Sequence, residues 1–109
     1  MPQQIIQTNF HFDLPASDFE RGASSVATQF DHIPGLQWKI WLFNEERKEG
    51  GGIYLFVNKN AVTNFKNSDL FHGVATNPAF HTFSVKQFEV LEAPSLLTHA
   101  PLSRRLTIL

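Results

Sequence analysis

The chain has 109 residues, a formal net charge of −1, and 42% hydrophobic residues, eleven of them Phe. This length fits one domain spanning residues 1–109, and the apolar content excludes a disordered segment. The charge balance provides no basic patch for nucleic acid or an anionic membrane, and without cysteine there is neither a disulfide framework nor a thiolate metal site. Because the N-terminus lacks a signal-peptide pattern and no apolar run is long enough to span a bilayer, we expect a cytoplasmic protein.

The N-terminal third predicts a strand followed by a helix. Residues 5–12 alternate between apolar and polar side chains, with one cleanly apolar face, which is typical of a strand. Ser17 and Glu20 have the spacing of a capping box, and apolar side chains then recur at helical spacing over residues 19–33. The helix is expected to end at the Pro-Gly turn of residues 34–35.

The middle of the chain predicts a hairpin. Residues 36–44 have strand character, and residues 45–49 form a charged tip. We expect the three glycines at residues 50–52 to form a turn, because they precede a strand rather than a phosphate-binding helix. Residues 53–57 are apolar on both faces and are expected to pair with residues 36–44.

A broken helix and a last strand complete the predicted core. Asn58 or Asn60 can cap a helix, and Ser68 can cap a further turn or two after a break at residues 67–68. Residues 80–91 predict a strand whose apolar parity shifts, which indicates a bulge near residues 86–87. The tail from residue 95 to residue 109 is too apolar to be a free end, so we expect it to pack on its own subunit or on a partner.

The order β-α-β-β-α-β with a C-terminal extension is an α+β, ferredoxin-like arrangement. Its two helices cover only one face of the sheet. The more apolar parity is expected to face the helices: Thr8, Phe10, Phe12, Trp38, Ile40, Leu42, Ile53, Leu55, Val57, Phe83 and Val85. The other face would then carry Lys39, Trp41, Tyr54 and Phe56, and we expect two subunits to form a homodimer by packing these faces together.

The candidate site residues are mostly aromatic. Trp38 is the expected wall of a flat apolar pocket, and His72, beside the helix break, is the candidate catalytic base by elimination. The candidate binding residues are Phe10, Phe12, Phe65, Phe71, Asn9 and Tyr54. The same aromatic residues could instead be plain core, His72 could be a surface residue, and Asn9 could bond across a dimer. The five His residues lack metal-ligand spacing, so no metal is expected.

Two motifs carry a resemblance to a known family. Residues 34–41 read PGLQWKIW and residues 49–56 read EGGGIYLF. Together with the segments FHF at 10–12 and KQFEV at 86–90, they resemble the YdhR family of putative mono-oxygenases over nearly the whole chain. The resemblance implies a dimeric α/β barrel formed by two ferredoxin-like subunits. It also implies a likeness to small oxygenases that use neither metal nor flavin, and in which an aromatic substrate loses a proton and reacts with oxygen itself.

Residues 67–71 also resemble the helix break of haem-degrading members of the same superfamily. Those proteins use an Asn, a Trp and a His together. Phe65 stands about where the Trp would fall, and Ala75 where the His would fall. This departure argues against haem binding.

Three functions are compatible with these observations. The first is a cofactor-independent mono-oxygenase acting on a small aromatic, phenol- or quinol-like substrate. The second is a non-catalytic small-molecule-binding or stress-related module that uses the same pocket. The third is a structural dimer with a filled core. A cavity between the sheet and the helices would favour the first two.

Overall fold

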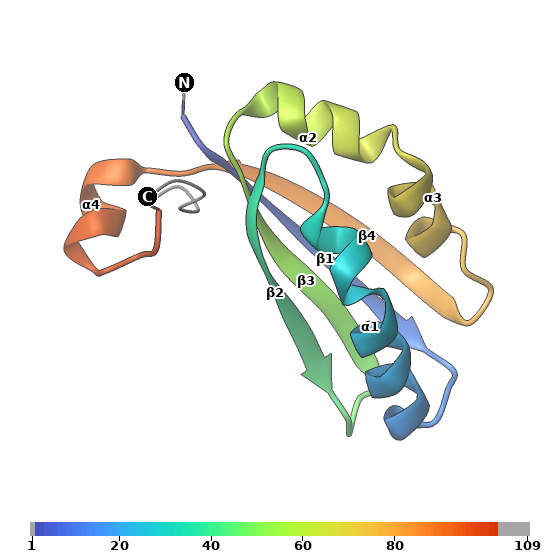
Figure 1. Cartoon of the computed structure of the whole chain (residues 1–109). Coiled ribbons are helices and arrows are strands. Elements are labelled where there is room, and N and C mark those ends of the chain that lie inside the picture. Colours follow the sequence, from blue (N-terminus) through green and yellow to red (C-terminus); the bar gives the residue numbers. More distant parts are fainter. Residues whose placement is uncertain (1, 103–109) are drawn as a thin grey trace.

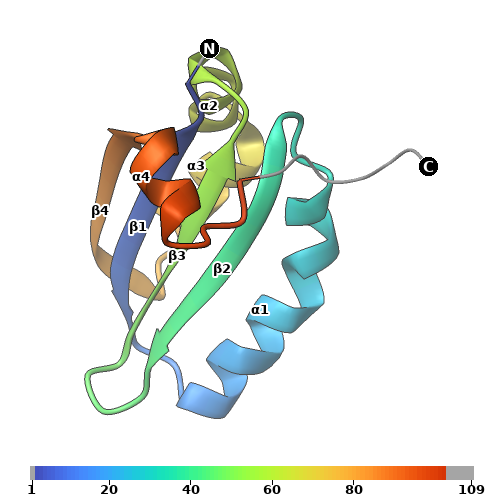
Figure 2. The same cartoon turned by 90° about the vertical axis from the view of Figure 1, so that its left-hand side faces the viewer.

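The computed structural model describes residues 2–102, which form one antiparallel sheet with helices on both faces (Figure 1). The elements in chain order are β1 (Gln4–Phe12), α1 (Ala16–Asp31), β2 (Leu36–Asn44), β3 (Glu49–Phe56), α2 (Lys59–Lys66), α3 (Asp69–Ala75), β4 (Phe80–Glu89) and α4 (Glu92–Leu97). The strand order is β2-β3-β1-β4, so the predicted ferredoxin-like fold is confirmed. Helices α1, α2 and α3 lie on one side of the sheet, and α4 lies on the other (Figures 1 and 2).

Polar side chains cap two of the three helices on the main helical side of the sheet. Asn58 accepts a hydrogen bond from the backbone N–H of Ala61 and caps α2, and Ser68 accepts one from Phe71 and caps α3. The predicted break between these helices is therefore confirmed. The capping box predicted at Ser17 is wrong, because α1 already begins at Ala16 after Pro15, and no side chain bonds this helix start.

The three consecutive glycines lie inside β3 and not in a turn, which corrects the predicted start of this strand. Two of them make room for side chains from neighbouring elements. A Cβ on Gly50 would lie 2.6 Å from the Phe19 ring, and one on Gly52 would lie 2.6 Å from Cε of Lys39. Glycine at these two positions therefore leaves the space in which side chains of α1 and β2 cross the strand.

A bulge in β2 decides which side chains face the helices. Leu36 pairs with Phe56 and Trp38 pairs with Leu55, so Gln37 is an extra residue and the side-chain alternation shifts by one. After the bulge, Lys39 and Trp41 face the helices, whereas Trp38 and Ile40 face away from them.

The expected assignment of faces is therefore wrong for both middle strands. Lys39, Trp41, Tyr54 and Phe56 lie on the helical side, and Trp38, Ile40, Leu42, Ile53 and Leu55 lie on the opposite side. The parity predicted for β1 is correct, with Ile6 opposite Tyr54 and Gln4 opposite Phe56. Because β3 is apolar on both faces, only its register with β1 determines its orientation.

The second register irregularity lies between β1 and β4, near Asn9 and His11. Thr82, in the facing part of β4, has a positive φ of 57°. The bulge expected near residues 86–87 is therefore in the wrong place, although the strand does contain an irregularity. Its effect is to bring Phe80 and Phe83 to the helical side, where both stack with Phe10.

The core lies between the sheet and α2 and extends under the end of α1. Its buried side chains are Ile6, Phe30, Leu36, Tyr54, Phe56, Ala61, Val62 and Phe65. Full burial of one large apolar side chain contributes about 1.5–3 kcal/mol. This packing holds one end of the helical layer tightly against the sheet.

The segment after β4 crosses the other face of the sheet. In Figure 2, α4 lies in front of the strands. The Trp38 indole N–H donates to the carbonyl of Pro101 at 2.8 Å, and the Gln3 amide donates to that of Leu102 at 3.1 Å. Pro101 and Leu102 of the predicted apolar tail thus contact their own subunit, whereas residues 103–109 lie outside the described part of the chain. Within residues 2–102, no helix is long and apolar enough to cross a membrane.

Candidate functional site

A pocket of about 640 Å³ opens between the helical face of the sheet and helices α1 and α3. Its volume falls in the usual range of small-molecule sites. The strands contribute Thr8, Phe10, Lys39, Trp41, Tyr54 and Phe80. The helices contribute mainly small and apolar side chains, among them Gly22, Ala23, Val26, Leu70, Gly73 and Val74. The reading of a completely filled interior is therefore wrong.

Phe rings form one end of the pocket. The Phe10 ring stacks on the Phe80 ring with centroids 4.2 Å apart, and it meets the edge of Phe19 at 5.9 Å. Phe19 in turn stacks on Phe12 at 4.3 Å, with the rings almost parallel. Offset and edge-to-face contacts of this kind hold aromatic side chains in defined orientations. This end of the pocket therefore offers flat, preorganised apolar walls.

Lys39 is the unusual residue of the site. Its Nζ lies 3.4 Å from the centre of the Trp41 ring, 3.7 Å from that of Phe30 and 4.6 Å from that of Tyr54. None of the ion pairs within residues 2–102 involves Lys39. The ring faces favour the ammonium form, whereas burial disfavours it, and burial lowers the pKa of Lys39 from 10.5 to about 7.

Tyr54 lies beneath the same part of the pocket and is almost fully buried. Burial raises the pKa of its phenol, and a hydrogen bond with the Thr8 side chain partly offsets this effect. Tyr54 is therefore a neutral phenol at physiological pH. It can donate a hydrogen bond, but it cannot act as a base.

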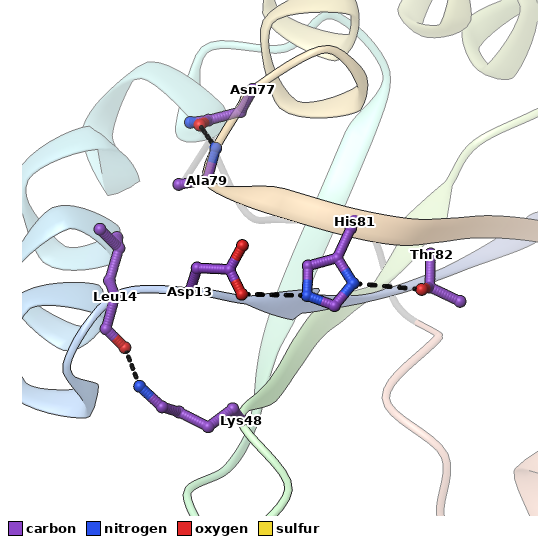
Figure 3. A network of polar contacts seen from close by, with 7 residues as sticks. All are labelled: Asp13, Leu14, Lys48, Asn77, Ala79, His81 and Thr82. Carbon is purple, nitrogen blue, oxygen red and sulfur yellow. Dashed lines mark hydrogen bonds and ion pairs between the residues drawn. The ribbon is translucent and has the colours of Figure 1, made fainter.

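A polar network supports the loops at the end of the pocket (Figure 3). The Lys48 ammonium donates to the carbonyl of Leu14, and the Asn77 side chain accepts from the N–H of Ala79 at 2.9 Å. Leu14 and Asn77 both line the pocket. Nearby, Nε2 of His81 lies 3.1 Å from a carboxylate oxygen of Asp13. Together with the hydrogen bond from the Asp13 N–H to the carbonyl of Ala79 at 2.9 Å, these contacts tie the β1–α1, α3–β4 and β2–β3 connections together.

The structure brings only part of the predicted site together. Phe10 and Tyr54 line the pocket. Phe12 and Phe65 are buried beneath it, and Phe71 is half-buried against Phe65 and Phe83. These three rings support the walls.

The two predicted catalytic residues are not at the pocket. Trp38 lies on the opposite face of the sheet because of the bulge at Gln37, so its placement beside Phe10 and Phe12 is wrong. Asn9 also lies on that face and accepts a hydrogen bond from Gln7 at 3.0 Å. His72 is exposed on α3, outside the set of residues that line the pocket.

Lys39 and Trp41 line the pocket although neither was predicted as a pocket residue. One signal was present, because a lysine between two tryptophans, in a strand with aliphatic neighbours, is unusual at a solvated position. A one-residue bulge cannot be recognised from the alternation alone when both faces of the strand are apolar. Among residues 2–102, no group of three or more His, Asp and Glu side chains is arranged to hold a metal ion.

The ferredoxin-like fold of the chain is shared by several solved structures. One similar structure is SnoaB from Streptomyces nogalater, described as a cofactor-independent oxygenase, with 17% identity, 83% of this chain and 94% of that chain covered, and a TM-score of 0.66. Another is a putative antibiotic biosynthesis monooxygenase from Caulobacter crescentus, with 16% identity and a TM-score of 0.67, where the match covers 84% of this chain and 92% of that chain. A third is the haem-degrader MhuD from Mycobacterium tuberculosis, with 17% identity and a TM-score of 0.61, where the match covers 80% of this chain and 95% of that chain. At these identities the likeness shows the fold alone.

Sequence comparison identifies the family. Residues 5–101 match the family described as "Putative mono-oxygenase ydhR". The chain belongs to this family, as the motifs at residues 34–41 and 49–56 predicted. A search of the curated proteins gives no match.

Proposed function

We propose that this protein is a cofactor-independent mono-oxygenase that oxidises a small aromatic, phenol- or quinol-like substrate in the pocket between the sheet and helices α1 and α3. The observation that carries the proposal is the pocket itself, which has flat aromatic walls at Phe10, Trp41 and Phe80 and polar side chains, Lys39 among them, beside these walls. Membership of the mono-oxygenase family supports the reaction type. The description of SnoaB as a cofactor-independent oxygenase, on the same fold, supports the absence of a cofactor.

The proposed chemistry balances without an external reductant. Loss of a proton turns the bound phenol, or the methylene group of its keto tautomer, into an electron-rich anion. The anion adds dioxygen at carbon and takes up a proton to form a hydroperoxide. Loss of water then leaves a carbonyl group, so that R₂CH₂ and O₂ give R₂C=O and H₂O. The pocket assists by holding the anion in a fixed orientation against its aromatic walls.

Oxygen uptake by the chelator-treated protein, with a panel of hydroquinones and anthrone-like compounds, tests the proposal. Labelled dioxygen should place one oxygen atom in the product and the other in water. Trp41→Leu should lower uptake about tenfold or more, and Trp38→Leu, the matched change on the opposite face of β2, should lower it far less. Uptake that disappears with the chelator would contradict a metal-free reaction. No uptake with any compound, despite measurable binding, would favour the non-catalytic binding module.

We also propose that two copies of the chain form a homodimer through the sheet face opposite the pocket. This face carries Ile40, Leu42 and Phe88, and the Ile40 and Phe88 side chains are 51% and 53% exposed. Leu97 on α4, at 81% exposed, lies on the same side. Exposed apolar side chains on a sheet face are typical of an interaction surface, and a second copy offers a complementary one. The surface expected earlier, centred on Lys39, Trp41, Tyr54 and Phe56, instead faces the protein's own helices, where Tyr54 and Phe56 are buried and Lys39 and Trp41 line the pocket.

A further inference from the structure

We propose that Lys39 is the catalytic base of the pocket: its amine removes the proton from the bound phenol, and the ammonium that results holds the substrate anion while the anion reacts with oxygen. This inference rests on the proposed function and assigns a residue to its first step. It also narrows the substrate to a phenol, or to a keto tautomer whose methylene group is acidified by a conjugated carbonyl. In the step, the substrate O–H or C–H bond breaks, its electron pair stays on the substrate, and an N–H bond forms on Lys39.

The geometry places the amine where the substrate must lie. Nζ is held over the faces of Trp41 and Phe30, and these two side chains also line the pocket. Gly52, on the neighbouring strand, leaves the space through which the lysine stem passes. An aromatic substrate stacked in the pocket therefore meets an amine whose position is fixed by packing and not by an acidic partner.

The other titratable groups of the pocket do not fit this role. Asp18 is exposed and paired with Arg21, and Asp69 is exposed in the first turn of α3, so neither carboxylate is withdrawn from water. Tyr54 is neutral and engaged with Thr8. Lys39 is therefore the one group among the pocket residues of the described chain that is both withdrawn from water and able to accept a proton near neutral pH.

The immediate surroundings of the Lys39 amine favour an anionic ligand. An ammonium that is held among aromatic rings and takes part in none of the ion pairs within residues 2–102 is costly, and a phenolate supplies the missing opposite charge. Transfer of the proton from substrate to Lys39 creates the two charges next to each other, so that each stabilises the other. The same ammonium can then return its proton to the peroxide anion that forms when oxygen adds to the substrate.

A chromogenic phenol tests the inference without requiring oxygenase activity. We would bind 4-nitrophenol, whose neutral and ionised forms differ in their visible spectra, and titrate the complex with pH. Lys59→Met, which changes an exposed lysine at the start of α2, is the control. Both the wild-type protein and this control should lower the apparent pKa of the bound probe by about one unit, which corresponds to about tenfold tighter binding of the phenolate than of the neutral phenol. Lys39→Met should abolish this shift, while its affinity for 4-nitroanisole, which cannot ionise, should change less than about threefold. The same shift in Lys39→Met would overturn the assignment.

A measurement on the wild-type protein covers the case in which Lys39→Met does not fold. The lysines would be labelled by reductive ¹³C-methylation, and the Lys39 resonance would be titrated with and without 4-nitrophenol. The probe should raise the pKa of Lys39, because the phenolate stabilises the ammonium, and an unchanged pKa would overturn the inference. Measurements of oxygen uptake test the role of Lys39 and the proposed oxygenase function separately. Full uptake in Lys39→Met would remove only the role of Lys39, whereas probe ionisation without uptake of oxygen by any substrate would remove the oxygenase and leave an anion-binding lysine.

Discussion

Lys39 and Trp41 lie two residues apart on the same face of β2, and the lysine Nζ is 3.4 Å from the centre of the indole ring. The contact exists because Gly52, which pairs with Trp41 across the strands, has no side chain to fill the space between them. A charged group thereby becomes part of an aromatic wall. The position is costly for folding and useful for proton transfer, and both consequences can be measured.

The first prediction concerns stability against pH in Lys39→Met. The unfolded chain keeps the lysine proton up to about pH 10.5, whereas the folded protein releases it near pH 7. Between these values the unfolded state binds more protons, so stability rises with pH, and the cost of burying the charge is fully present below pH 7. We expect Lys39→Met to be more stable than wild type by about 2 kcal/mol below pH 7, and this difference to shrink as the pH approaches 10.5. Urea denaturation across this range checks it, and a difference independent of pH would contradict it.

The second prediction contrasts two adjacent glycines. A Cβ on Gly51 would lie 2.0 Å from the backbone carbonyl oxygen of Thr8, whereas a Cβ on Gly52 meets first the flexible end of Lys39, at 2.6 Å. We therefore expect Gly51→Ala to destabilise the protein by about 3 kcal/mol or more, because the β1–β3 pairing must shift, and Gly52→Ala to cost about 1 kcal/mol. Gly52→Ala should instead displace the amine from the rings and raise the pKa of Lys39 towards its ordinary value. Thermal unfolding together with the NMR titration of Lys39 distinguishes the two outcomes, and equal stability of both variants would refute the argument.

The third prediction concerns the pocket wall on α3. Gly73 lines the pocket, and a Cβ added there would meet no atom within 4 Å. Gly73→Ala should stabilise the protein by about 0.5–1 kcal/mol, because alanine is the better helix former, and should leave ligand binding largely intact. Gly73→Phe should fold but fill the pocket and weaken 4-nitrophenol binding about tenfold or more. Calorimetric binding with both variants tests this, and unchanged binding in the Phe variant would place the ligand elsewhere.

The fourth prediction tests the proposed dimer. Ile40→Asp would place an unpaired carboxylate on the exposed apolar face, which should weaken association about a hundredfold. Thr28→Asp, at an exposed position of α1 on the other side of the molecule, is the matched control and should leave association unchanged. Sedimentation over a range of protein concentrations gives the association constants. A wild-type protein that is monomeric at micromolar concentration would contradict the dimer.

The sequence-based prediction was most accurate where local chemistry determines the structure. The caps at Asn58 and Ser68 and the break between α2 and α3 follow from short polar side chains that bond the backbone within three residues. The faces of β1 were correct because one of its faces is polar over most of its length. The same reasoning failed in β2 and β3, where both faces are apolar and the alternation carries no information about orientation.

The sequence alone thus determined the order of the elements, the ferredoxin-like sheet and the family, because these depend on local periodicity and on motifs that are contiguous in the chain. Only the tertiary structure decided which side chains form the site. The bulge at Gln37 turns Lys39 and Trp41 towards the helices and Trp38 away from them, and the register with β1 turns Tyr54 inward. Which side chains face the pocket depends on how strands distant in the sequence pair, and on the glycines of β3 that leave space for side chains of neighbouring elements. This arrangement arises from interactions between residues far apart in the chain, which the pattern of any one strand does not contain.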